Sequence, residues 1–121
     1  MMKSVMYIIT DDPKERCDLV SSVLAQAVTT LAYGYDCEIF LMDRGITLAV
    51  KGHLDSLKSK AFDPLSVLLD SYREMKGKLY ICDPSTSALG ISQEDCIDVD
   101  GYVNASKLLE SSGKAMAVFT Y

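Results

Sequence analysis

Cys82 is the residue whose type and position best suit nucleophilic chemistry. It ends the apolar segment KLYIC, residues 78–82, and the polar run DPSTS follows directly. This pattern predicts a buried strand that leads into the N-terminus of a helix. Free backbone N–H groups and the helix dipole favour an anion there, and the thiolate is the reactive form of cysteine.

The same segment also has a purely structural interpretation. Asp83 follows the cysteine directly, and its negative charge disfavours a neighbouring thiolate. No lysine, arginine or histidine lies within DPSTS to offset that charge. Cys82 would then simply fill the end of a strand, as buried cysteines commonly do. The residues of this segment leave both interpretations open.

Familiar cysteine and cofactor motifs are absent from the sequence. Cys17, Cys37, Cys82 and Cys96 show no C-x-x-C spacing, which excludes the usual zinc and thioredoxin-type motifs. A phosphatase-type loop would need an arginine where Ala88 stands. The glycine fingerprint of dinucleotide sites and the P-loop are missing as well. We therefore expect four free thiols and no metal or organic cofactor.

Composition indicates a globular protein in the cytoplasm. The 121 residues suit one domain, 1–121, with 49% hydrophobic residues and a net charge of -5. This acidic balance argues against binding nucleic acid directly. The sequence has no apolar run of membrane-spanning length, and its N-terminus does not resemble a signal peptide. His53, in the polar segment KGHLD, is expected to be a solvated surface residue.

Apolar runs alternate with helical patterns along the chain, which predicts an α/β fold with a five-stranded, mainly parallel sheet in a three-layer α/β/α sandwich. The carboxyl ends of parallel strands are where such folds bind ligands, and the segment after residue 82 belongs to that edge. We expect strands at 4–10, 37–42, 78–82, 96–99 and 114–121. Helices are expected at 13–32, 46–50, 64–75, 87–91 and 104–113, the last of them capped near Asn104, with a further capped helix start at 92–95.

Four segments, taken in order, resemble the DsrE/DsrF/DsrH-like family of sulfur-relay proteins. They are VMYIITDDPKERCDLVSSVLAQAVTTLAYGYDCEIFLM, DRGITLAVKG, KLYICDPSTSALGI and SGKAMAVFTY. The resemblance implies a compact α/β sandwich that assembles into trimers or hexamers. It also implies that Cys82, at the family's cysteine position, carries sulfur as a persulfide between donor and acceptor proteins. Many relatives have a second cysteine where this chain has Ser85, which puts disulfide chemistry within the segment in doubt.

The function expected from this resemblance is that of a DsrE-like sulfur carrier, a sulfurtransferase-type role with Cys82 as the catalytic residue. The backbone N–H groups of Ser85, Thr86 and Ser87 would hold the persulfide anion, assisted by the hydroxyls of Ser85 and Thr86. One alternative is a non-catalytic binding or assembly subunit of a DsrE-like oligomer, in which Cys82 only packs. A weaker alternative is a small nucleotide- or flavin-binding module that uses the Ser/Thr-rich segment to hold a phosphate.

Overall fold

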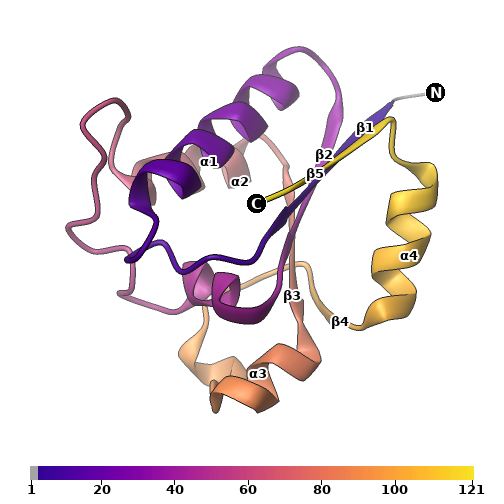
Figure 1. Ribbon diagram of the computed structural model, residues 1–121. Helices are drawn as coiled ribbons and strands as arrows, with labels where there is room; N and C mark the ends of the chain where they lie inside the picture. The colour runs from indigo at the N-terminus through magenta and orange to yellow at the C-terminus, as the bar shows by residue number, and fades with distance from the viewer. Residues whose placement is uncertain (1–2) are drawn as a thin grey trace.

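The computed structural model describes residues 3–121, and within them a five-stranded sheet has the strand order β4-β3-β2-β1-β5 (Figure 1). Each pair of neighbouring strands is parallel. The predicted five-stranded, mainly parallel sheet is therefore confirmed. The strands are β1 (Ser4–Ile9), β2 (Asp36–Leu41), β3 (Lys78–Cys82), β4 (Gly101–Val103) and β5 (Ala117–Thr120).

Helices connect the strands and cover both faces of the sheet, as Figure 1 shows. Helices α1 and α2 lie together on one face, α4 lies on the other, and α3 follows β3 at the carboxyl edge. The helical segments are α1 (Cys17–Ala32), η1 (Asp43–Ala49), α2 (Leu65–Glu74), α3 (Asp83–Leu89), η2 (Gln93–Asp95) and α4 (Ala105–Lys114), where η marks a 3₁₀ helix.

Each central strand presents side chains to both faces of the sheet, because successive side chains along a strand point to opposite faces. Both faces can therefore pack against helices, which gives three layers. Tyr7 and Ile39 belong to the main hydrophobic core, together with Leu24 of α1 and other buried residues of α1 and α2. On the opposite face, the Glu38 carboxylate accepts a hydrogen bond of 3.3 Å from the Ser111 hydroxyl of α4. The three-layer α/β/α arrangement predicted from the sequence is confirmed.

Helix α1 begins at Cys17, four residues later than the predicted start at Pro13. The Asp12 carbonyl accepts bonds of 3.0 Å from the backbone N–H groups of Glu15 and Arg16. These bonds form a turn before the helix. A proline and acids, as at 11–15, are typical of a first helical turn, but here these residues belong to the turn before the helix.

The fourth strand lies at 101–103, so the strand predicted at 96–99 was wrong. Cys96 makes only an isolated antiparallel bridge to Val50, and the N–H of Ile97 donates to the Ala49 carbonyl at 2.8 Å. Cys96 belongs to the hydrophobic core and Ile97 packs against it, both outside the sheet. This packing explains why the segment is apolar although it is not a strand. The chain joins the sheet only at Gly101, which pairs with Tyr80 of β3.

A close crossing of η1 over the end of β1 shapes the carboxyl edge of the sheet. A Cβ atom on Gly45 would lie 2.0 Å from the carbonyl oxygen of Ile9, so only glycine fits there. The same carbonyl accepts the N–H of Met42 at 3.0 Å. The segment after β2 is thereby fixed next to β1. Across the described residues, none of the helices is long and apolar enough to cross a bilayer.

Candidate functional site

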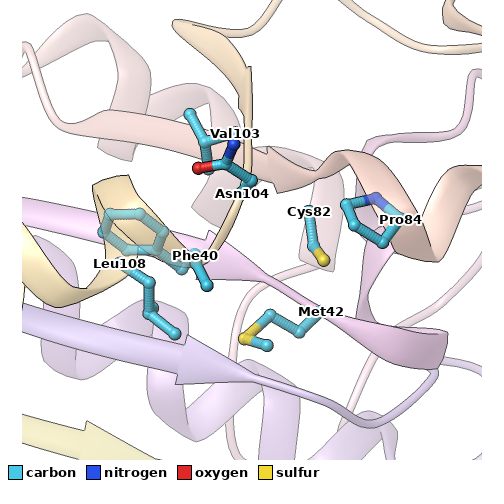
Figure 2. A pocket seen from close by; sticks show the side chains of 8 residues that line it. Phe40, Met42, Cys82, Pro84, Val103, Asn104 and Leu108 are labelled. Carbon is cyan, nitrogen blue, oxygen red and sulfur yellow. The ribbon is translucent and has the colours of Figure 1, made fainter.

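Cys82 is the last residue of β3 and directly precedes α3. Its backbone pairs in parallel register with Val103, the last residue of β4. The side chain is half-buried, and its sulfur points toward the space between the side chains of Met42 and Pro84 (Figure 2). The β3 end therefore holds a thiol at the carboxyl edge of the sheet, where parallel α/β folds place their ligands.

A partly enclosed cavity of about 140 Å³ adjoins this thiol (Figure 2). Its wall comes from the ends of three neighbouring strands and from the starts of α3 and α4. Most of these side chains are apolar, and none carries a charge. The residues that line the cavity are Phe40, Met42, Cys82, Pro84, Val103, Asn104, Ala105 and Leu108.

Secondary structure explains why these residues converge. Phe40 and Met42 lie at the end of β2, and Val103 ends β4, so both strands flank Cys82 on β3. Asn104 caps α4, since its side-chain Oδ1 accepts the Ser106 N–H at 3.0 Å, as the sequence predicted. Sequence reasoning missed this cavity because its wall comes from segments up to 68 residues apart. The signal that could have indicated the cavity was the prediction that the carboxyl ends of neighbouring parallel strands meet at one edge of the sheet.

The segment DPSTS is helical, so its interpretation as a loop before a helix at 87–91 was wrong. Helix α3 starts at Asp83, directly after Cys82. The Ser85 hydroxyl accepts the backbone N–H of Asp43 at 2.9 Å, and the Thr86 hydroxyl donates to the Asp83 carbonyl at 2.6 Å. Thr86 is buried, whereas Ser87 is exposed on α3. The hydroxyls of Ser85 and Thr86 thus hold the local backbone, and the anion-holding role of residues 85–87 stays a prediction.

His53 is not the solvated residue that the sequence suggested. Its Nε2 lies 2.8 Å from Oδ1 of Asp12, and the two side chains are only 15% and 19% exposed. Burial raises the pKa of Asp12, but hydrogen bonds from His53 and from the Lys14 N–H outweigh this effect and hold the pKa below its ordinary value. His53 lines a different cleft, beside Thr47, and is not among the residues around Cys82.

The four cysteines are free thiols with different environments. Burial raises the pKa of Cys37 to about 12, and the Cys37 side chain is only 2% exposed. Burial also raises the pKa of Cys96, which is 5% exposed. Cys17 and Cys82 are half-buried, but Cys17 lies on α1, outside the cavity-lining set. Within the part of the chain that the structure describes, no three His, Cys, Asp or Glu side chains gather as metal ligands would.

The model of the DsrE/DsrF-like family matches residues 3–121. The chain belongs to this family. The resemblance inferred from the four sequence segments is therefore confirmed over nearly the whole chain. No curated protein matches the sequence.

Solved structures share the fold across nearly the full length of this DsrE/DsrF-like chain. The ychN protein from E. coli superposes with a TM-score of 0.72 at 19% sequence identity, covering 100% of both chains. MTH1491 from Methanobacterium thermoautotrophicum, described as a protein of unknown function, gives 0.67 at 14% identity, again over 100% of both chains. BT1422 from Bacteroides thetaiotaomicron, also of unknown function, gives 0.69 at 10% identity, covering 98% of this chain and 95% of its own. At such identities the superpositions establish the fold alone.

Proposed function

We propose that this DsrE/DsrF-like protein is a sulfur carrier that accepts and passes on sulfur as a persulfide on Cys82. The observation that carries the proposal is the position of this thiol. Cys82 ends a central strand at the ligand-binding edge of the sheet and opens on a cavity, whereas Cys37 and Cys96 are buried. Family membership supports the same chemistry.

The transfer step needs one thiolate and no cofactor. The Cys82 thiolate attacks the outer sulfur of a donor persulfide, R–S–SH, and a new bond forms between Sγ and that sulfur. The donor S–S bond breaks, and its electron pair leaves with the donor thiolate, R–S⁻. The transferred sulfur keeps its hydrogen, so the product is Cys82–S–SH. To deliver the sulfur, an acceptor thiolate attacks the outer sulfur of Cys82–S–SH. The S–S bond breaks, and Cys82 leaves as a thiolate.

Donor and acceptor proteins are the partners proposed for this exchange, and a homo-oligomer is the proposed assembly. Apolar side chains are exposed on α4 and around the edge strand β5: Leu109 is 74% exposed, Met116 49% and Val118 42%. Exposed apolar groups beside an unpaired strand edge are typical of surfaces that another chain covers. A trimer or hexamer would cover them.

A second candidate function, the non-catalytic assembly subunit, rests on these same exposed residues. In that case the protein would bind other subunits, and the thiol at β3 would only pack. The nucleotide or flavin module has no comparable support, since no lysine or arginine lines the cavity at Cys82 to pair with a phosphate.

Intact-mass spectrometry after incubation with a persulfide donor tests the carrier function. We expect the wild-type protein to gain the mass of one sulfur atom, which a reductant removes. Cys82→Ser should abolish the gain. Cys17→Ser is the matched control, because Cys17 is the other half-buried thiol, and it should leave the gain unchanged.

Two results would contradict the carrier function. Loading that survives Cys82→Ser would assign the sulfur to another thiol. A wild-type protein that never gains sulfur would favour the assembly subunit, and sedimentation of Leu109→Lys and Val118→Lys variants would then show whether this surface holds an oligomer together.

A further inference from the structure

The cavity beside Cys82 lacks any charged group that would bind an anionic partner. Neither Asp83 nor any lysine or arginine belongs to its lining. The one polar side chain apart from Cys82, that of Asn104, uses its Oδ1 to cap α4. An ion that entered the cavity would lose hydration without gaining a counter-charge, which is costly. The lining therefore selects against charged groups.

An apolar group gains from the same lining. Phe40 is 2% exposed, and its ring stacks on Tyr80 with 5.0 Å between centroids, so this wall is held firmly. Met42 and Leu108 supply further apolar contacts. The thioether side chain of Met42 is flexible and adapts to groups of varied shape. Burial of apolar surface against such walls is favourable in proportion to the area removed from water.

The volume limits the size of the occupant. The cavity measures about 140 Å³. An engineered apolar cavity of roughly 150 Å³ in another protein binds benzene, so a group of about six non-hydrogen atoms fits a space of this size. A phenylalanine or leucine side chain meets this limit, whereas a nucleotide or a whole peptide segment exceeds it.

Resting on the proposed carrier function, we infer that the sulfur-donor protein presents its persulfide next to a large apolar side chain, such as phenylalanine or leucine, and that this side chain enters the cavity between Met42 and Leu108. The group in the cavity would hold the donor segment while its outer sulfur meets the Cys82 thiolate. A donor with a charged or amide side chain in the same place would dock poorly. Recognition of the partner would thus depend on one apolar side chain, and the chemistry on the thiol beside it.

Short peptide persulfides test this inference. The first peptide has one cysteine persulfide with phenylalanine on both sides, and the second has glutamine in place of both phenylalanines, so the two carry the same charge and share the same leaving group. Mass spectrometry follows the rate at which each loads sulfur onto Cys82. We expect the phenylalanine peptide to load the wild-type protein about tenfold faster, from burial of the ring.

Variants of the cavity wall show whether this preference arises there. Leu108→Asn makes the wall polar without adding charge and should remove the preference, because the phenylalanine peptide loses its apolar contacts. Val103→Thr, a nearly isosteric change in β4, should reduce the preference too and serves if Leu108→Asn does not fold. Val67→Asn is the control, because Val67 is 46% exposed on α2, across the sheet from α4, and the preference should persist.

Different failures have different meanings. Equal rates for the two peptides, or a preference that survives both wall variants, would overturn the inference and leave the carrier function standing. Loading by free benzyl persulfide but by neither peptide would also overturn it, because the donor would then be a small molecule. A protein that no donor loads would overturn the carrier function, and this inference with it.

Discussion

The structure predicts that the four thiols react with a maleimide in a fixed order. In the folded protein at pH 8, Cys82 and Cys17 should be modified first and Cys37 last. Burial raises the pKa of Cys37 from its ordinary value of 9.0 to about 12, although a hydrogen bond with Tyr72 opposes the shift. Three pKa units lower the thiolate fraction at pH 8 by about a thousandfold, and since only the thiolate reacts, modification of Cys37 should be slow. The low exposure of the side chain slows the reaction further.

Peptide mapping by mass spectrometry after timed additions of N-ethylmaleimide measures each rate. Labelling in concentrated urea provides the control, because all four cysteines should then react at similar rates. Modification of Cys37 in the folded protein on the same time course as Cys82 would refute the burial on which this reasoning rests. Fast modification of Cys96 would contradict the core position that the structure gives it.

Two further predictions concern the carboxyl edge of the sheet. Gly45→Ala should lower the free energy of unfolding by more than about 2 kcal/mol in urea titrations, because its Cβ would lie 2.0 Å from the Ile9 carbonyl oxygen; Gly113→Ala, with nothing within 4 Å of its Cβ, should cause no loss. Asp12→Asn should cost about 1 kcal/mol at pH 7, because it removes the carboxylate bonded to His53. Since the pKa of Asp12 is lowered in the folded state, its stabilisation is present above its unfolded pKa and is lost on acidification, so thermal midpoints of the variant and the wild type should converge below about pH 4. An equal difference at pH 7 and pH 3 would contradict this account.

Local patterns in the sequence sufficed to place the three central strands along the chain. The apolar runs at 4–10, 37–42 and 78–82 are bounded by glycine, proline or acidic residues, and all three are strands within one or two residues of the prediction. The cap of α4 was likewise predicted, because an asparagine cap acts through the residues directly after it.

Other features depend on contacts that no local pattern reveals. The apolar run at 96–99 suggested a strand, yet Ile97 packs against the core and only residues 101–103 pair with β3. His53 looked like a loop residue because its partner, Asp12, lies 41 positions earlier. Cys82 was identified as the candidate nucleophile from its position in the sequence. Its apolar surroundings were not identified, because Phe40 and Leu108 lie far from Cys82 in the sequence. They come near it only through the order of the strands in the sheet.

Transfer of sulfur through a complete cycle tests the carrier role of Cys82. The protein is loaded with sulfur from a persulfide donor, separated from the donor, and mixed with an acceptor thiol in excess. Trapping with an alkylating agent and mass spectrometry then measure persulfide on the Cys82 peptide before mixing and on the acceptor afterwards. We expect one sulfur on Cys82, which appears on the acceptor as the protein loses it. A Cys82 peptide without added sulfur, or a loaded sulfur that no thiol removes, would contradict a carrier role.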